Sequence, residues 1–389
     1  MKNALNKLKK YSHILKIIFE SMRILILTKR QYMNRDLLND RYGRFRELPL
    51  ALAASGHEVT GLCLSYRPRK EGLVEDIDGE ALVTWHALNA KRLLPLGSTS
   101  YWRILDNIEK DFRPDLVWAC SDAIHAILGV RVASRLGAPL VIDLYDNFES
   151  YWMTRLPGVT SMFRRALRRA DGITCVSKPL SHYVRETMSY KGPIEVIENA
   201  VPKGLFQHMD KAVCRNQLGL PVDALIIGTA GSISRSRGIE TLFQAFEKVS
   251  GDHPDVYLAL AGPCDKGLAI PENPRVLYLG NLSPKEVPAF LCSLDIAVVC
   301  NKESAFGKYC FPQKFYESVA CGIPTVAAGT GSMQELLKDK PEYLYEPENV
   351  DSLVGVLGNL INNPSKLDIE VPTWNDLGKR LEVFFKSIL

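Results

Sequence analysis

Short apolar runs alternate with amphipathic stretches along most of this chain of 389 residues. The apolar runs lack strict alternation of apolar and polar residues, which is typical of strands buried on both faces of a parallel sheet. These runs span residues 23–28, 58–64, 115–120, 139–144, 172–177 and 194–198, and then 225–231, 256–262, 275–280, 295–300 and 324–328. Amphipathic stretches between them, such as 44–55 and 123–136, predict helices that cover the sheets.

This series of strands and helices occurs twice, and the two series meet around residues 200–220. At roughly 100–200 residues per domain, a chain of this length is expected to form two domains. We therefore predict an α/β fold with two doubly wound parallel-sheet domains facing each other across a cleft. Such sheets bind ligands at the carboxyl ends of their strands, so functional residues are expected in the loops that follow the strands.

The positive charge of the chain is concentrated at its N-terminus. Residues 1–21 contain five lysines and one glutamate, which accounts for the whole formal net charge of +4. The rest of the chain has no broad excess of basic residues, so no nucleic-acid partner is expected. Apolar residues of this segment fall near one helical face, which suits peripheral contact with an anionic membrane. The alternatives are a packing or frayed extension and a natural start of the chain at Met22.

The sequence gives no indication of a transmembrane helix, a disulfide framework or a metal site. No apolar run approaches the roughly 20 residues that span a bilayer. The nine cysteines are scattered singly, without a C-x-x-C motif, and the seven histidines do not cluster at ligand spacing. We expect reduced thiols in a cytoplasmic protein, with no metal and no cofactor.

The stretch FPQKFYESVACGIPTVAAGTG, residues 311–331, combines a helix start with a glycine-rich turn. Pro312 suits the first turn of a helix, and the i, i+3 spacing puts Lys314 and Glu317 on one face. A cation and free backbone N–H groups near a helix start suit a diphosphate. An ionised glutamate only accepts hydrogen bonds, so Glu317 suits a ribose diol. A surface Lys–Glu pair is the alternative, which this stretch taken alone would favour.

A second glycine-containing turn, GTAGSISRSRG, follows the first strand of the second half. Gly231 and Ser232 permit close approach of a ligand to the backbone. Arg235 and Arg237 supply fixed positive charge just before a helix, and arginine is a bidentate phosphate ligand. A solvated basic loop is the alternative for this turn.

These motifs together resemble those of the retaining GT-B glycosyltransferases of family 4. Arg237-Gly238 matches a basic residue–glycine pair, and the pattern P-x-K-x-x-E-x-x-A-x-G-x-P begins at Pro312. Further landmarks are ALAASGHEVTGL, ADGITCVSKPL, IEVIENAVPKGLF, VYLALAGP, LYLGNLSPKEVPAFLCSLDIAVV and TWNDLGKRLEVFFKSIL. Single motifs of this kind are weak, whereas their order over residues 22–389 is specific.

The resemblance implies a nucleoside diphosphate sugar donor in the second domain and an acceptor in the first. Glu317 would bind the ribose, while Lys314 with Arg237 or Arg235 would stabilise the departing diphosphate. The implied reaction is retaining transfer to a glycan acceptor that is lipid-linked or a polysaccharide precursor. The enzyme would be cytoplasmic, with attachment at the inner face of the membrane as a variant. A GT-B nucleotide-sugar epimerase and a non-catalytic nucleotide-sugar-binding protein are the alternatives.

The acceptor side departs from the family pattern at two places. The first-domain glycine loop contains Gly43 followed by Arg44, which suits a phosphate or an anionic acceptor, or else an exposed helix start. The histidine that many members carry before Asp146 is replaced by Tyr145, which can hydrogen-bond a sugar hydroxyl. His125 lies where the family sometimes has a histidine, and a core or helix-capping histidine is the alternative.

The donor side departs at Tyr309, where the family often has a glutamate, with Glu303 nearby as a loose substitute. The resemblance implies catalytic roles for Arg237, Lys314 and Asp146, and substrate binding by Glu317, Arg235, Gly231, Ser232, Gly331, Ser332, Gly43, Arg44, His125 and Tyr145. It divides the chain into a basic extension (1–21), an acceptor-side domain (22–205), a nucleotide-sugar domain (206–375) and a last helix (376–389) that crosses back to the first domain.

Overall fold

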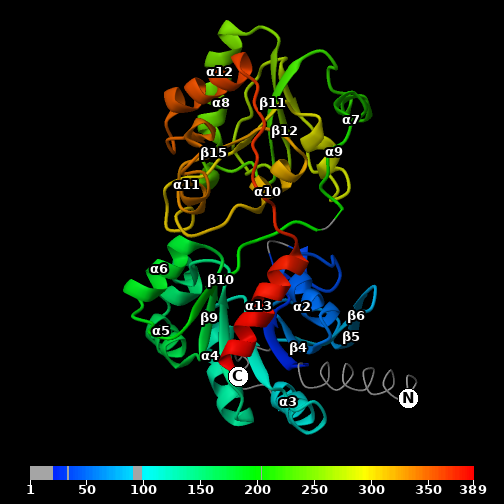
Figure 1. The fold of residues 1–389 in the computed structure, drawn as a ribbon, viewed down its shortest axis with the longest axis vertical. Helices are drawn as coiled ribbons and strands as arrows, with labels where there is room; N and C mark the ends of the chain where they lie inside the picture. The colour runs from blue at the N-terminus through cyan, green and yellow to red at the C-terminus, as the bar shows by residue number, and fades with distance from the viewer. Residues whose placement is uncertain (1–20, 33–34, 91–98, 203) are drawn as a thin grey trace, which may run out of the picture. The chain divides into compact units, whose positions relative to one another are not determined.

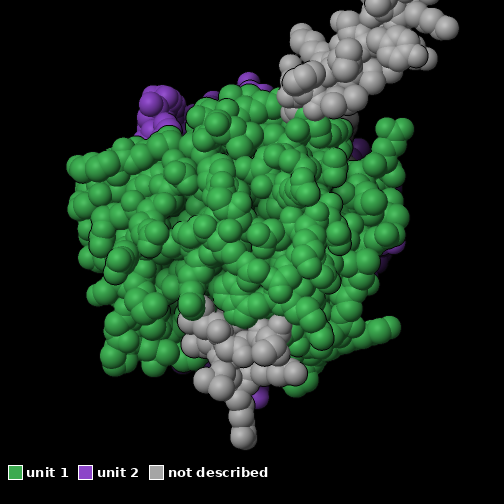
Figure 2. Space-filling view, turned by 90° about the horizontal axis from the view of Figure 1, so that it is seen from below, with its two compact units in different colours: residues 1–176, 181–197, 374–389 green, residues 177–180, 198–373 purple. Residues whose placement is uncertain are grey.

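The computed structural model describes residues 21–32, 35–90, 99–202 and 204–389. These residues form two compact units, each with its own helix-covered sheet (Figure 1). Unit 1 comprises residues 1–176, 181–197 and 374–389, and unit 2 comprises residues 177–180 and 198–373. Figure 2 shows one face of unit 1 in green. The predicted α/β fold with two parallel-sheet domains is confirmed. The basic segment discussed above lies, except for Ser21, outside the described residues.

Unit 1 is built on an eight-stranded sheet with the order β10-β9-β8-β7-β1-β4-β6-β5. The strands are β1 Arg23–Lys29, β4 Glu58–Ser65, β5 Gly72–Asp78, β6 Ala81–Asn89, β7 Leu116–Ala119, β8 Leu140–Leu144, β9 Gly172–Cys175 and β10 Ile194–Val196. All neighbours pair in parallel except β5 and β6, which pair antiparallel. The strands predicted for the first half are all present.

The β5–β6 pair is an element that the sequence did not indicate. β5 carries three acidic residues and is mostly exposed, so its apolar pattern is too weak to mark a strand. It is held by pairing with β6 at the edge of the sheet, from Gly72 opposite Ala87 to Asp78 opposite Ala81. A short antiparallel pair, β2 Gln31–Tyr32 with β3 Arg35–Asp36, also follows β1.

Six helices accompany the sheet of unit 1 in the described part of the chain: α2 Arg44–Ala54, α3 Thr99–Asp111, α4 Ala123–Leu136, α5 Val159–Arg169, α6 Lys178–Glu186 and α13 Trp374–Ile388. The C-terminal helix α13 packs against α2 near the start of the chain. A Cβ atom on Gly378 would lie 2.5 Å from the Cβ of Ala51, so glycine is what permits this close approach. The ring of Phe385 meets Trp118 of β7 edge-on, with 5.5 Å between the ring centroids.

Unit 2 contains a six-stranded, fully parallel sheet with the order β13-β12-β11-β14-β15-β16. Its strands are β11 Leu225–Ala230, β12 Val256–Ala261, β13 Val276–Tyr278, β14 Ile296–Val299, β15 Thr325–Ala328 and β16 Leu344–Tyr345. Its helices are α7 Lys211–Leu218, α8 Ile239–Asp252, α9 Val287–Cys292, α10 Gln313–Ala320, α11 Ser332–Leu336 and α12 Val350–Asn362. The five strands predicted for the second half are confirmed, and β16 is an additional short edge strand.

Both sheets reverse their strand order beside the first strand of the unit. In unit 1 the chain moves outward from β1 through β4 and β6, and later from β7 through β8 and β9 on the other side. In unit 2 the same reversal lies between β11 and β14. Loops that leave the two strands at such a reversal diverge to opposite sides, and the crevice between them is where doubly wound sheets bind ligands.

Among the described residues, none of the helices combines the length and the apolar character that crossing a bilayer requires. The described part of the chain also contains no group of three or more His, Cys, Asp or Glu side chains placed to hold a metal ion.

Candidate active site

The helix α10 places Lys314 and Glu317 at the carboxyl edge of the unit 2 sheet, in the segment that follows β14. Lys314 is half-buried, and its ammonium makes no hydrogen bond or ion pair with any described residue. Burial lowers the pKa of Lys314, and the charge of the nearby Arg237 guanidinium acts in the same direction. Burial and one neighbouring cation thus both disfavour the charged form of Lys314, and an anion beside its ammonium would favour that form.

Glu317 lies one turn further along α10 and is also half-buried. Burial raises the pKa of its carboxyl group to about 7, although a hydrogen bond from Gln313 and the charge of Lys314 oppose this shift. The Nε2 atom of Gln313 donates to the carboxylate at 3.1 Å. Glu317 is therefore partly protonated near neutral pH when no ligand is bound.

The two arginines after β11 have different surroundings. A short 3-10 helix, η4 Arg235–Arg237, begins at Ser234 and ends at Gly238 in the left-handed region, with φ of 73°. The Arg237 guanidinium lies over the Phe306 ring, 4.1 Å from its centroid. Arg235 is exposed and points to Glu240, which accepts its Nε–H at 3.2 Å. The structure therefore brings Arg237, and not Arg235, beside Lys314.

Glycines at the ends of β11 and β15 allow the chain to pass close to neighbouring backbone. Gly231 has φ of 103°, and a Cβ atom on the facing Gly262 would lie 2.0 Å from the Gly231 carbonyl oxygen. Gly331 has φ of 54°, and a Cβ atom there would lie 2.4 Å from the carbonyl oxygen of Lys308. Gly231 is thus favoured by its backbone conformation alone, whereas Gly262 and Gly331 are required by conformation and by space.

The two serines that follow these glycines differ in exposure. Ser232 is exposed at the end of β11. Ser332 is buried at the start of α11, and its hydroxyl donates to the carbonyl of Cys310 at 2.7 Å. This bond ties the start of α11 to the segment that leads into α10. The proton of the Ser332 hydroxyl is therefore used in a hydrogen bond within the protein.

A pocket of about 580 Å³ opens beside the loop that follows β15. Gly329, Thr330 and Gly331 line it together with Glu303 and Lys308. Glu303, the loose substitute for the missing family glutamate, therefore lines a pocket next to the expected phosphate-binding loop.

In unit 1, Tyr145 and Asp146 follow β8 at the carboxyl edge of the sheet and share a small hydrogen-bond network. Lys29, the last residue of β1, donates from Nζ to the Tyr145 hydroxyl at 3.2 Å. Tyr151 donates to the Asp146 carboxylate at 2.6 Å and to the Tyr145 hydroxyl at 3.3 Å. Lys29 and Tyr151 were not indicated by the sequence, although Lys29 directly follows the strand predicted over residues 23–28, and that position could have suggested it.

His125 belongs to the same edge of the sheet, in the first turn of α4. Its Nδ1 lies 2.8 Å from the Asp122 carboxylate, which also accepts the Tyr66 hydroxyl at 3.0 Å. Burial acts to raise the pKa of Asp122, but the His125 imidazole and its hydrogen bonds outweigh burial and lower it to about 2. The ionised carboxylate only accepts hydrogen bonds, so Nδ1 of His125 carries a proton.

Nε2, the other ring nitrogen of His125, is a buried polar atom without a hydrogen-bond partner in the described residues. His125 is only 1% exposed. When the imidazole carries a single proton, that proton lies on Nδ1 and Nε2 is an acceptor. The backbone N–H of His125 also donates to the Asp122 carboxylate at the start of α4. His125 therefore also takes part in capping this helix, which was the alternative role for it.

Gly43 and Arg44 lie at the start of α2, and Gly43 has φ of 93°. The Arg44 side chain is completely buried and forms an ion pair with Asp143 of β8 at 2.7 Å. Its Nη1 also donates to the Ile197 carbonyl at 2.6 Å. The alternative of an exposed Arg44 at a helix start is therefore wrong, because the side chain turns into the core and pairs with a buried carboxylate. Its substrate-binding role stays a prediction.

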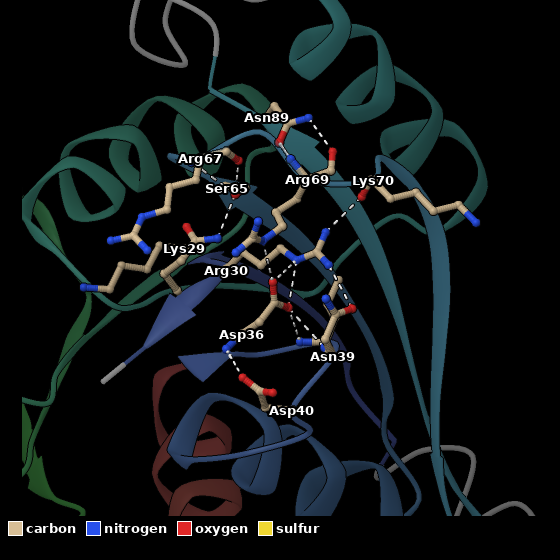
Figure 3. Close-up of polar contacts among 12 residues, drawn as sticks. Lys29, Arg30, Asp36, Asn39, Asp40, Ser65, Arg67, Arg69, Lys70 and Asn89 are labelled. Atoms are coloured by element: carbon tan, nitrogen blue, oxygen red, sulfur yellow. Dashed lines mark hydrogen bonds and ion pairs between the residues drawn. The ribbon is translucent and has the colours of Figure 1, made fainter. Parts of the chain in front are cut away.

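A polar network joins the segments that follow β1 and β4 to Asn89, the last residue of β6 (Figure 3). At its centre Arg30 donates to Asp36 at 2.9 Å and to the Lys70 carbonyl at 2.9 Å. Figure 3 shows the Lys29 and Arg67 side chains extending to the same side of this network. The Arg67 guanidinium makes no contact with a described residue that would neutralise it. The network therefore fixes a loop that presents positive charge at the carboxyl edge of the unit 1 sheet.

Two family models and the relatives found by comparison all indicate glycosyltransferases. The family model for Glycosyltransferase Family 4 matches residues 44–203, and the model for Glycosyl transferases group 1 matches residues 224–363. TuaH of Bacillus subtilis (strain 168), assigned by name to teichuronic acid biosynthesis as a glycosyltransferase, is 26% identical over 238 residues. That match spans 54% of this chain and 57% of TuaH, so it covers little more than half the length of this relative.

A second relative and one solved structure extend over more of the chain. The GDP-mannose-dependent monoacylated alpha-(1-6)-phosphatidylinositol monomannoside mannosyltransferase of Corynebacterium glutamicum is 22% identical over 76% of this chain and 82% of its own. The crystal structure of HepE from Anabaena in complex with UDP superposes with a TM-score of 0.65 and 18% identity. That likeness covers 94% of this chain and 97% of HepE, and it shows a shared fold.

Proposed function

Because this chain belongs to the GT-B glycosyltransferases of the family 4 type, we propose that it transfers a sugar from a nucleoside diphosphate sugar to a glycan acceptor with retention of configuration. The observation that carries the proposal is the half-buried Lys314, whose ammonium makes no ion pair with a described residue and which lies beside Arg237 and Glu317. An anion with two charged phosphates and a ribose would supply what this arrangement lacks.

The donor would be oriented by unit 2. Lys314 and Arg237 would contact the diphosphate, and the Glu317 carboxylate would accept hydrogen bonds from the two ribose hydroxyls. Negative charge on the diphosphate grows as the bond to the sugar breaks. Cations already fixed at that position stabilise the transition state more than the ground state, so they lower the barrier directly. HepE, a protein of the same fold, was solved with UDP, which supports a nucleoside diphosphate ligand.

The acceptor would be bound by unit 1, where His125, Tyr145 and Asp146 lie at the carboxyl edge of the sheet. The free Nε2 of His125 could accept a hydrogen bond from an acceptor hydroxyl. In retaining transfer by front-face attack, the leaving phosphate takes the proton of the attacking hydroxyl, so the protein supplies positioning and electrostatics. Lys29 and Arg67 would favour an acceptor that carries negative charge. The name of the Corynebacterium relative specifies a phosphatidylinositol mannoside acceptor, which supports a lipid-linked class.

The test begins with a thermal-shift screen of nucleoside diphosphate sugars against the purified full-length chain. A donor that raises the melting temperature is then incubated with lipid-linked and polysaccharide-precursor acceptors. We expect a transfer product whose anomeric configuration, measured by NMR, equals that of the donor. An inverted product would contradict the retaining mechanism. Binding of donors without transfer or hydrolysis would instead support the non-catalytic alternative, and release of nucleoside diphosphate with an epimerised free sugar would support the epimerase.

A further inference from the structure

One outer surface of unit 1 combines exposed apolar side chains with arginines. We define the Trp152–Arg169 patch as three apolar and four basic residues: Trp152, Leu156, Met162, Arg155, Arg165, Arg168 and Arg169. The exposed fractions of Trp152, Leu156 and Met162 are 70%, 48% and 50%. These residues come from the short 3-10 helix η3 Trp152–Arg155, from α5 and from the loop that joins them. The two helices pack against each other, and Figure 1 shows α5 at the periphery of unit 1.

The helix α5 divides its side chains cleanly between core and solvent. Phe163, Ala166 and Leu167 are buried against unit 1. Met162, Arg165 and Arg169 are exposed and follow one another at intervals of three and four residues, which places them along one strip of the opposite face. The buried face accounts for the packing of α5, and it leaves the exposed strip without a role in holding the fold together.

The arginines of the patch are not used in ion pairs. Their side chains make no hydrogen bond or ion pair with any residue that the structure describes; this holds for Arg155, Arg165, Arg168 and Arg169. Arg164 differs, because it donates to Glu149 at 2.6 Å and so belongs to the fold. From residue 150 to residue 170 the sequence contains five arginines and no aspartate or glutamate. Glu149 and Asp171 flank this stretch, and Glu149 pairs with Arg164, so the charge of the four patch arginines is not neutralised by any described ion pair and is available to an external anion.

We propose that the Trp152–Arg169 patch docks the enzyme on a membrane surface that contains anionic lipids. Arginines near such a surface are attracted to the phosphate headgroups, and tryptophan is enriched at the membrane–water interface, where its ring is apolar and its N–H is polar. The three apolar side chains would enter the headgroup boundary while the arginines contact phosphates. Nucleic acid is a poorer match, because apolar side chains at these positions would gain little from a phosphate backbone.

The patch would attach the enzyme to the membrane surface peripherally, and it does not include residues 1–21. This attachment also differs from the proposed transfer function, because vesicle binding needs neither a donor nor an acceptor. A lipid-linked acceptor would, however, be presented to unit 1 at the same surface on which the patch is held.

The test compares matched variants of the full-length chain by co-sedimentation with vesicles of phosphatidylcholine, with and without phosphatidylglycerol. Arg165→Gln/Arg169→Gln removes two charges from the patch, and Lys285→Gln/Lys366→Gln removes two charges from exposed sites of unit 2. We expect the parent protein and the lysine variant to pellet with anionic vesicles. The arginine variant should bind about tenfold more weakly, since each basic residue near the surface adds attraction. High salt should release the parent protein.

Trp152 supplies a second readout that does not depend on charge. Of the five tryptophans, Trp85, Trp118 and Trp374 are buried and Trp102 is half-buried, whereas Trp152 is 70% exposed. A shift of tryptophan emission to shorter wavelength on vesicle binding should therefore come mainly from Trp152. We expect the shift in the parent protein and its loss in Trp152→Phe. Trp152→Ser should weaken vesicle binding, whereas Leu73→Ser, at an equally exposed apolar position on β5, should not.

Deletion of residues 1–21 separates the two sources of positive charge. Retained pelleting of the truncated chain, lost again in truncated Arg165→Gln/Arg169→Gln, would support the patch. The proposal would be overturned if the arginine variant bound vesicles as tightly as the lysine variant. It would also be overturned if deletion of residues 1–21 by itself abolished vesicle binding. Donor binding measured by calorimetry should be the same in all these variants, and that result also shows that each variant is folded.

Discussion

Arg44 and Asp143 form a two-point ion pair in which both side chains have no exposed surface. Nη2 of Arg44 lies 2.7 Å from one carboxylate oxygen and Nε lies 3.1 Å from the other. The Thr174 hydroxyl also donates to this carboxylate at 2.6 Å. The pair links the start of α2 to the middle of the sheet, and it gives the Arg44 guanidinium an anionic partner within the protein.

We predict that Arg44→Met destabilises unit 1 by about 3–5 kcal/mol, because removal of one partner leaves the other charge buried and unpaired. Urea unfolding followed by circular dichroism measures this change. Arg41→Met is the control. Arg41 is half-exposed and shares Asp76 with Arg46, so its loss should cost no more than about 1 kcal/mol. An Arg44→Met protein of normal stability that loses transfer activity would instead favour a ligand-binding role.

The raised pKa of Glu317 predicts a stability that depends on pH. The ordinary pKa of this carboxyl group is 4.5, and its folded-state value is about 7. Between these values the folded protein binds a proton that the unfolded chain has lost, so this group lowers stability as pH rises from about 4.5 to about 7. Glu317→Gln should therefore be more stable than the parent at pH 8, by roughly 1–3 kcal/mol, and the difference should vanish near pH 4. Thermal unfolding at both pH values measures it.

Donor binding should respond to the same substitution in the opposite direction. The ionised carboxylate accepts two ribose hydroxyls, and hydrogen bonds to charged groups are worth roughly 1.5–3 kcal/mol each. We expect Glu317→Gln to bind nucleoside diphosphate at least about tenfold more weakly at pH 8 by calorimetry. The affinity of the parent protein should rise as pH increases through about 7, and that of the variant should not. An unchanged affinity in Glu317→Gln would contradict the ribose role.

Arg237→Ala should lower the turnover number more than it weakens donor binding. The charge of the leaving diphosphate grows toward the transition state, and loss of one such contact costs on the order of 3 kcal/mol in the barrier. Steady-state kinetics separates the two effects, because loss of uniform binding would raise KM alone. Arg235→Ala is the matched control, since its guanidinium is held by Glu240 and the Gly267 carbonyl at 3.2 Å each.

His125→Gln should impair transfer to the acceptor without changing donor affinity. The glutamine amide can still donate to Asp122, but it does not reproduce the buried acceptor atom at Nε2. We expect a fall in kcat/KM for the acceptor of about tenfold, the loss of one hydrogen bond. Rates of donor hydrolysis in water report whether the donor site is intact. Equal losses of transfer and of hydrolysis would mean that His125 acts through the fold.

The sequence predicted the two sheets well because their strands are continuously apolar, a pattern that burial on both faces requires. It also indicated where α10 starts, because Pro312 suits the first turn of a helix and α10 begins at Gln313. The edge strand β5 was missed because an edge strand with one solvent-facing side carries a mixed pattern, and its pairing with β6 depends on the fold around it.

The site was harder to predict than the fold, because sequence spacing does not say where a long side chain points. Arg235 and Arg237 are equivalent in a motif, yet one stacks on Phe306 and the other pairs with Glu240. For Arg44 the sequence suggested an anionic ligand or an exposed helix start, whereas its partner in the structure, Asp143, lies far away in the sequence. Contacts of this kind depend on which loops the strand order brings together, and no local pattern records them.

The membership of α13 in unit 1 sets an order for the assembly of this protein during synthesis. Unit 2 is almost continuous in the chain and can fold once residue 373 has left the ribosome. Unit 1 needs residues 374–389, which are made only after the whole of unit 2. The long sheet that begins at Arg23 therefore waits for α13 to cover Trp118 and Ala51. Chains that stop before Trp374 should leave this apolar surface open, and they are the ones we expect chaperones and proteases to capture.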